Sequence, residues 1–176
     1  MKKAAQKEIA SNQERTVPTV TPPAIRTIRV STTPSLSGKA TLTYLTGCSA
    51  DGEICIRVSA NSGGGFWSAE WVAFPAIQSA LANLPKDTPI TSYALRGLFS
   101  GKSVNSRGFL MAALKHLGLV QPMPDKQRCY VLLEPKPFLA EVKTLIDSGV
   151  ELPAAESSKH AAEGKKSASK DKVKIA

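Results

Sequence analysis

The residues from Thr91 to Leu133 constrain the fold more than any other part of this chain. They contain a short helical pattern, TSYALRGLF, and a longer one within SGKSVNSRGFLMAALKHLGLV, followed by two strand-like runs around a Pro-Met-Pro-Asp turn. In the longer pattern, apolar residues recur at helical spacing and predict one buried face. The residues of that face are Phe109, Leu110, Ala113, Leu114 and Leu117. Asn105 is placed to cap the start of this helix, and Gly118 to end it in the left-handed region.

This order of elements, a helix, a turn, a longer helix and a hairpin, resembles a winged helix-turn-helix domain over residues 90–134. The resemblance lies in the pattern of elements and not in a sequence signature. It implies binding to duplex DNA, as a transcriptional regulator or a nucleoid-type accessory factor, with the second helix presented to the major groove. Regulators of this kind are commonly homodimers, so a second copy or another protein is a further expected partner.

The expected DNA contacts follow from the helical pattern. If the apolar face points inward, Arg107, Met111 and Lys115 form an outward stripe. We expect Arg107 and Ser106 to meet base edges, and Lys115 to meet a phosphate. The turn before the helix and the wing tip supply further phosphate contacts. The expected nucleic-acid-binding residues are Lys102, Ser103, Ser106, Arg107, Lys115, Lys126 and Arg128.

The residues before this region predict a three-stranded antiparallel meander. KATLTYLT and EICIRVSA alternate with period two around the turn GCSADG, and GFWSAEWVAF is the third strand. One helix is predicted to begin at Pro75 and end before Pro85, and another covers PFLAEVKTLIDSG and ends at Gly149. The predicted fold is α+β: a single domain over residues 39–150, in which the meander precedes the winged-helix-like part.

The two ends of the chain differ from this domain in composition. Residues 1–38 are rich in Thr, Ser, Pro and Ala and predict a disordered arm, in which AIRTIRV forms an edge strand if the core offers a partner. Residues 151–176 predict a disordered tail rich in Lys, Ala and Ser, similar in composition to histone-like chromatin proteins. About two thirds of the formal net charge of +9 lies in these ends. Basic tails bind polyanions by counterion release, although charge also serves solubility alone.

Motifs for other chemistry are incomplete. Gly101-Lys102-Ser103 lacks the first glycine of a P-loop, because Arg96 stands at that place. The spacing of Cys48, Cys55, His116 and Cys129 matches no structural zinc pattern. No serine or cysteine lies in a recognisable nucleophile motif. We therefore expect no enzymatic activity, no cofactor and no metal. Glu70, among apolar neighbours, is expected to pair with Arg57.

Two alternative functions remain open. The glycines in SGGGFW allow a nucleic-acid strand to approach closely, and Phe66, Trp67 and Trp71 can stack on bases, which would make the chain a single-strand or RNA binder. Core packing of the two tryptophans behind a flexible tip is the simpler interpretation. The second alternative is a protein-interaction module like the accessory and inhibitor proteins of plasmids and phages. The lack of a membrane-spanning run or a secretory segment, together with three cysteines, predicts a cytoplasmic protein with no membrane partner.

Overall fold

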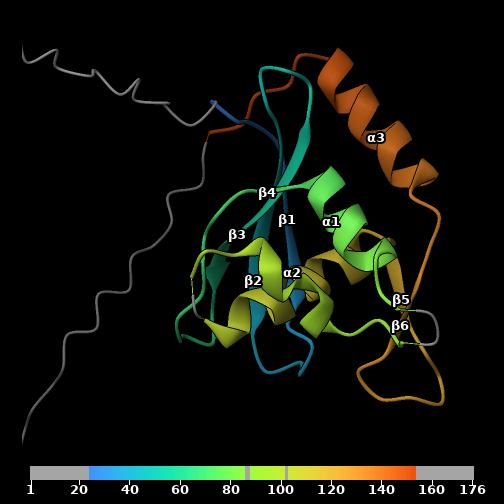
Figure 1. Ribbon diagram of the computed structural model, residues 1–176. Coiled ribbons are helices and arrows are strands. Elements are labelled where there is room, and N and C mark those ends of the chain that lie inside the picture. Colours follow the sequence, from blue (N-terminus) through green and yellow to red (C-terminus); the bar gives the residue numbers. More distant parts are fainter. Residues whose placement is uncertain (1–23, 86–87, 102, 154–176) are drawn as a thin grey trace, which may run out of the picture.

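The structure is a computed structural model that describes residues 24–85, 88–101 and 103–153. Most of the expected arm and tail lies outside these residues, and so does Lys102 of the expected site. The described residues form a mixed α+β architecture, in which helices pack against an antiparallel sheet (Figure 1). None of the helices within these ranges is long and apolar enough to cross a lipid bilayer.

The sheet has four antiparallel strands in the order β1-β2-β3-β4. Their bounds are Arg26–Pro34 (β1), Thr41–Cys48 (β2), Ile54–Asn61 (β3) and Val72–Ala73 (β4). β2 and β3 confirm the first two strands of the predicted meander. β4 takes up only two residues of the third predicted strand. The predicted antiparallel arrangement is therefore present, with one strand more than the sequence pattern indicates.

The additional strand, β1, lies within the segment whose composition predicts a disordered arm. That prediction is wrong for Arg26–Pro34. The run AIRTIRV contributes to the strand because the core does offer a partner: β1 pairs with β2 along its whole length, and Thr27, Ile28 and Thr33 are buried. β-Branched side chains suit a half-buried pleated surface, and pairing satisfies the backbone N–H and C=O groups. The folded part therefore begins before residue 39.

Helices and a hairpin follow the sheet. Their bounds are Phe74–Ala82 (α1), Ser92–Leu98 (η1, a 3-10 helix), Val104–His116 (α2), Val120–Pro122 (β5), Tyr130–Leu132 (β6) and Lys136–Asp147 (α3). Gly118 and Gly149 both have φ 70°, which confirms the two predicted helix ends. The Ser103 hydroxyl caps α2 by accepting a hydrogen bond from the Asn105 N–H at 3.3 Å. The predicted cap at Asn105 is therefore wrong by two residues.

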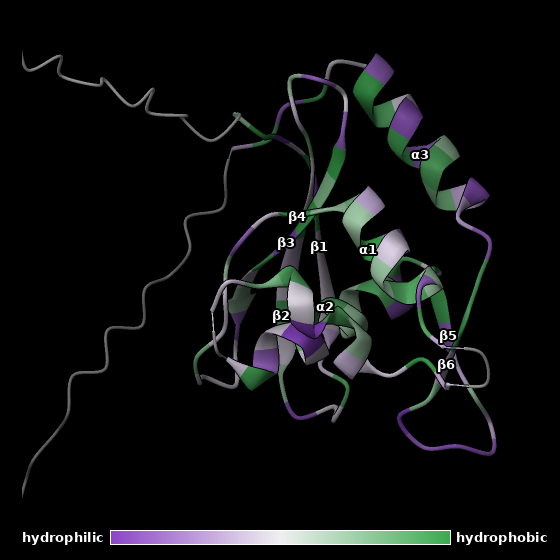
Figure 2. Ribbon diagram, in the orientation of Figure 1, coloured by the Kyte–Doolittle hydropathy of each residue, from purple (hydrophilic) through white to green (hydrophobic). Residues whose placement is uncertain are grey.

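One core joins the sheet to the helices. A single buried cluster contains side chains from β1, β2 and β3 and from all three α-helices. α3 joins it through Phe138, whose ring centre lies 5.2 Å from that of Phe74. An ion pair between Arg29 and Glu141, at 2.9 Å, links α3 to β1. Figure 2 shows hydrophobic and hydrophilic residues alternating along α3, as expected for a helix with one buried face.

Candidate nucleic-acid interface

Two arginine side chains lie against one exposed tyrosine ring near the start of α2. Tyr93 is 56% exposed. The guanidinium carbon of Arg96 lies 5.4 Å from the centre of the Tyr93 ring, and that of Arg107 lies 4.9 Å from it. Arg96 also donates a hydrogen bond from Nη1 to the Tyr93 hydroxyl at 2.6 Å. Both distances to the ring are within the range of cation–π contacts, which hold the three side chains, here named the Tyr93 cluster, in one group.

The local fold brings the Tyr93 cluster together. Tyr93 and Arg96 lie three residues apart in η1, and in a 3-10 helix every third side chain points the same way. The Thr91 hydroxyl caps η1 by accepting a hydrogen bond from the Tyr93 N–H at 3.3 Å. α2 packs on η1, so Arg107 in the first turns of α2 reaches the same ring. Two arginines from different elements thus share one site.

The Tyr93 cluster borders a hollow of about 640 Å³. The described residues that line it are Tyr93, Arg96, Phe99, Ser100, Gly101, Ser103, Val104 and Arg107. This lining contains two arginines and no carboxylate. Among the described residues the ion pairs are Arg29–Glu141 and Lys136–Glu134, so neither arginine of the cluster is paired there. Guanidinium groups without a protein carboxylate suit phosphate, which they bind through charge-assisted hydrogen bonds.

Glu70 binds the loop that precedes α2. Its carboxylate accepts hydrogen bonds from the Ser100 N–H at 3.1 Å and from the Ser100 hydroxyl at 3.4 Å. The bond from the Ser100 backbone N–H lowers the pKa of Glu70. The predicted ion pair with Arg57 is wrong, because the Arg57 guanidinium instead lies over Trp71, 5.8 Å from the ring centre. Glu70 therefore fixes the loop beside the Tyr93 cluster.

Replacing Glu70 with glutamine is expected to destabilise the protein in a pH-dependent way. A carboxyl group whose pKa is lowered on folding adds stability above its unfolded pKa, and this stability is lost as the pH falls through the folded pKa. The difference in unfolding free energy between wild type and Glu70→Gln should therefore be present at neutral pH and shrink below about pH 4. Urea titrations across this range measure it. A difference that stays constant with pH would contradict the role given to the ionised carboxylate.

Two residues of α2 are buried, although the sequence pattern predicts that one meets base edges and that the other lies on the outward stripe. Ser106 is 1% exposed, and its hydroxyl accepts a hydrogen bond from the Ser68 N–H at 2.7 Å. Met111 is fully buried. The prediction that Ser106 meets base edges and that Met111 lies on an outward stripe is therefore wrong for this structure. The reason is that α2 packs on η1 and also on β1 and β3, so two sides of the helix are covered.

The remaining expected contacts fall in separate places. Ser103 and Arg107 line the hollow of the Tyr93 cluster. Lys115 is exposed but lies about 12 Å along α2 from Arg107. It lines another hollow, beside the connection that leaves β1. Lys126 and Arg128 are exposed in the β5–β6 loop, which is largely hydrophilic (Figure 2). The structure thus brings Ser103 and Arg107 together at one hollow, whereas Lys115, Lys126 and Arg128 do not line it.

The segment between β3 and β4 is anchored to α2. The carbonyl oxygen of Phe66 accepts hydrogen bonds from the Ser103 hydroxyl and from Asn105 Nδ2, the latter at 3.0 Å. The Trp67 ring N–H donates to the Val58 carbonyl at 3.2 Å, and the ring packs against Phe109. The expectation that Trp67 packs inward is confirmed to the extent that it is half-buried. The Phe66 side chain, in contrast, is 82% exposed.

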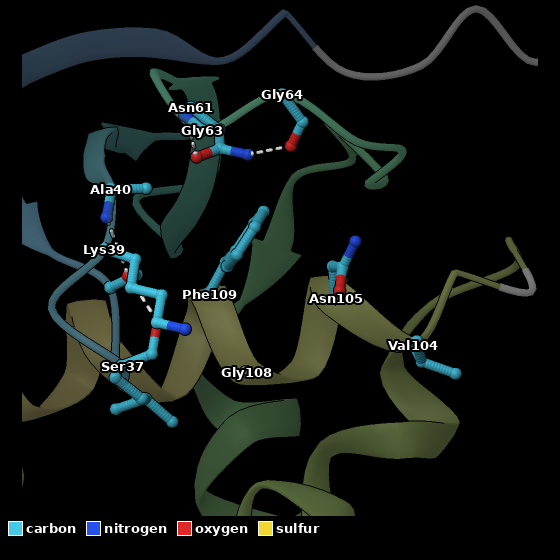
Figure 3. A pocket seen from close by; sticks show the side chains of 12 residues that line it. Ser37, Lys39, Ala40, Asn61, Gly63, Gly64, Val104, Asn105, Gly108 and Phe109 are labelled. Carbon is cyan, nitrogen blue, oxygen red and sulfur yellow. Dashed lines mark hydrogen bonds between the residues drawn. The ribbon is translucent and has the colours of Figure 1, made fainter.

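A second hollow, of about 390 Å³, is shown in Figure 3, and Val104 lines both hollows. It is bounded by the β1–β2 connection, the glycine-rich loop after β3, and α2. Lys39, from the β1–β2 connection, and Phe109, from α2, both line it. The Asn61 side chain holds the loop, because Nδ2 donates to the Gly64 carbonyl at 2.5 Å and Oδ1 accepts from the Gly63 N–H at 3.0 Å. The described lining again contains a cation and no carboxylate.

Two cysteines of the described part of the chain are buried in the core. Cys48 and Cys55 are buried free thiols. Burial raises the pKa of Cys55 to about 11, so this thiol stays protonated at neutral pH. Within residues 24–85, 88–101 and 103–153, no group of three or more His, Cys, Asp or Glu side chains is placed to hold a metal ion.

Three exposed residues near the start of α2 are not among the DNA contacts that the winged-helix pattern predicts. They are Tyr93, Arg96 and Phe66. The sequence could have indicated that Tyr93 and Arg96 lie together, because residues three apart are neighbours on a helix. The position of Phe66 depends on how the β3–β4 segment folds back onto α2, which no local pattern indicates. No family model, curated protein or solved structure matches this chain.

Proposed function

We propose that this chain is a DNA-binding protein and that its helical part is a winged helix-turn-helix. The order of elements supports the second statement: α1, η1 and α2 are followed by the β5–β6 hairpin. Ile90, just ahead of η1, forms an antiparallel bridge with Tyr130 of β6. The segment before the helix pair therefore lies beside the hairpin, as a third strand position next to the proposed wing.

The Tyr93 cluster is the observation that carries the proposal. Its two arginines lie beside the first turn of α2, and the hollow they border has no carboxylate among its described lining residues. In the proposed function, Arg96 and Arg107 bind backbone phosphates, while Lys126 and Arg128 of the wing make further phosphate contacts. The net charge of +9 adds affinity that depends on salt and not on base sequence.

Removing both arginines of the cluster tests this function. The full-length Arg96→Ala/Arg107→Ala variant is expected to bind labelled DNA at least about tenfold more weakly than wild type, because each arginine that neutralises a phosphate also contributes counterion release. The slope of log affinity against log salt should become shallower by about 0.9 for each phosphate that is no longer neutralised. Fluorescence anisotropy at several salt concentrations measures both quantities.

The matched control is Lys136→Ala/Lys143→Ala, which removes two exposed positive charges from α3. This control should change the affinity far less than the cluster variant does. Circular dichroism and urea unfolding establish that both variants are folded. Equal reductions in the two variants would mean that only net charge matters, and this would overturn the role of the Tyr93 cluster.

A protein-docking role is the second candidate, and it is favoured by an exposed apolar surface on the hairpin. Val131 and Leu132 of β6 are 42% and 49% exposed. Leu132 also borders an apolar hollow of about 150 Å³ between α1 and the hairpin. Exposed apolar surface of this kind is typical of interaction sites. Wild-type protein that binds no DNA in the anisotropy experiment would favour this candidate.

A further inference from the structure

Most of α2 is buried by neighbouring elements, whereas a helix that reads a DNA groove has one face exposed to solvent. Met111 and Ala112, in the middle of the helix, are 0% and 1% exposed. Near its end, His116 Nδ1 shares a hydrogen bond of 2.7 Å with the hydroxyl of Tyr44 on β2. A major groove is about 12 Å wide and about 8.5 Å deep, so a helix that lies in it exposes one face along its length. α2 is buried over residues 110–114, so its exposed side chains are at the first turns and at its last two residues, and no continuous open face joins them.

The three most exposed of the large apolar side chains gather near those first turns. Phe66 is 82% exposed, Val104 is 66% exposed and Tyr93 is 56% exposed, the three highest values among the exposed large hydrophobic residues of the described chain. A single exposed apolar side chain is common on a protein surface, but several gathered in one place are typical of an interaction site. The Phe66 backbone is held by Ser103 and Asn105 of the α2 start. Its ring is therefore presented to solvent from a fixed backbone and not from a loose loop.

Cations lie on both sides of this apolar surface. Val104 borders both hollows: the one in Figure 3, which Lys39 and Phe109 line, and the one of the Tyr93 cluster. Neither described lining includes an aspartate or a glutamate. Glu70, the acidic residue that contacts this region, uses its carboxylate to bind Ser100. A path across the start of α2 thus combines exposed rings with positive charge on either side.

We infer that this surface binds single-stranded DNA, with a base stacked on Phe66, further bases beside the Tyr93 ring, and phosphates held by Lys39, Arg96 and Arg107. The inference rests on the proposed function and names the form of DNA that the site takes. Aromatic platforms along a positively charged groove are how proteins bind unpaired strands without base sequence preference. Paired bases in a duplex are stacked on each other and do not offer their faces to such rings.

The test uses full-length protein with a labelled oligothymidine of about 16 nucleotides and a duplex of the same length. A salt concentration near 0.2 M weakens the affinity that the basic ends contribute. The loss in log affinity is roughly proportional to the number of phosphates that they contact. Wild type should bind the single strand more tightly than the duplex. Phe66→Ala should weaken single-strand binding by about tenfold or more because it removes a stacking ring, and it should leave duplex binding nearly unchanged.

Two further variants complete the experiment. Phe66→Trp retains a stacking ring, so it should keep the affinity, and its added fluorescence should be quenched by the oligothymidine. Val30→Ala shortens another exposed apolar side chain, on β1, and should bind as wild type does. Duplex preference in wild type, or unchanged single-strand binding by Phe66→Ala, would overturn the inference but leave the proposed function in place. Absence of binding to either DNA would overturn the proposed function itself.

Discussion

Replacing Met111 with lysine is expected to destabilise the folded protein by about 4 kcal/mol or more, a large part of the roughly 5–15 kcal/mol that stabilises an ordinary domain. Met111 is fully buried where α2 meets its neighbouring elements. An ammonium group at this position loses its hydration, and burial of an unpaired charge is among the costliest single changes in a protein. Urea unfolding followed by circular dichroism measures the change in stability.

The matched control is Val104→Lys on the same helix. Val104 is 66% exposed, so this change should cost no more than about 1 kcal/mol, part of it from a positive charge at a helix N-terminus. The two variants together test whether Met111 is buried, as in the structure, or lies on the outward stripe that the sequence pattern predicts. If Met111 faced solvent on a DNA-reading face, Met111→Lys would keep its stability and bind DNA more tightly.

Replacing Ser106 with alanine is the second large effect, with an expected destabilisation of about 1–3 kcal/mol. Ser106 is buried, and its hydroxyl is the acceptor for the Ser68 N–H at 2.7 Å. Alanine leaves that N–H without its partner, and an unsatisfied donor costs more than an average hydrogen bond contributes. Because Ser68 lies two residues after Phe66, the change also loosens the segment that presents this ring.

The exposed serine Ser37 provides the comparison for Ser106. Its hydroxyl contacts only the Ser35 hydroxyl, at 3.3 Å on the surface, so Ser37→Ala should stay within about 0.5 kcal/mol of wild type. Thermal or urea unfolding of both variants gives the difference. A Ser106→Ala protein with unchanged stability and weakened DNA binding would instead place the hydroxyl at bases, as the helical pattern predicts.

Elements with strong local signals are predictable from this sequence. The alternation in KATLTYLT and EICIRVSA predicts β2 and β3, and Pro75 predicts the start of α1 because its fixed φ suits a first helical turn. Gly118 and Gly149 end their helices with the left-handed φ that glycine adopts readily. Each signal acts over a few residues, so no knowledge of the tertiary fold is needed.

β1 shows where local signals are insufficient. Its sequence, RTIRVSTTP, lies in a Thr-, Ser- and Pro-rich stretch whose composition alone favours disorder. It becomes a strand because it pairs with β2, from Arg26 opposite Cys48 to Pro34 opposite Thr41. The composition of a segment does not indicate which other segment it pairs with. β4 shows the opposite error, since most of GFWSAEWVAF leaves the sheet to fold onto α2 instead.

The candidate site, like the fold, has some residues that the sequence predicts and others that it does not. Arg107 is identified from the helical pattern, but the pattern assumes that α2 has a single buried face. The burial of Ser106, Met111 and Ala112 arises because a second layer, the sheet, covers the helix from another side. The interactions of Arg107 with Tyr93 and of Ser103 with Phe66 join residues far apart in the chain. No spacing rule within one element predicts either interaction.

The bridge between Thr27 and Leu152 brings the two ends of the described part of the chain together. The Leu152 N–H donates to the Thr27 carbonyl at 2.8 Å, so the first strand and the last described residues meet at one edge of the sheet. Chains with adjacent ends tolerate circular permutation, because a short linker can join the ends and a new start can open in a surface loop. A variant in which a short linker joins these two ends, and the chain starts in a surface loop instead, is therefore expected to keep the Tyr93 cluster and Phe66 in place.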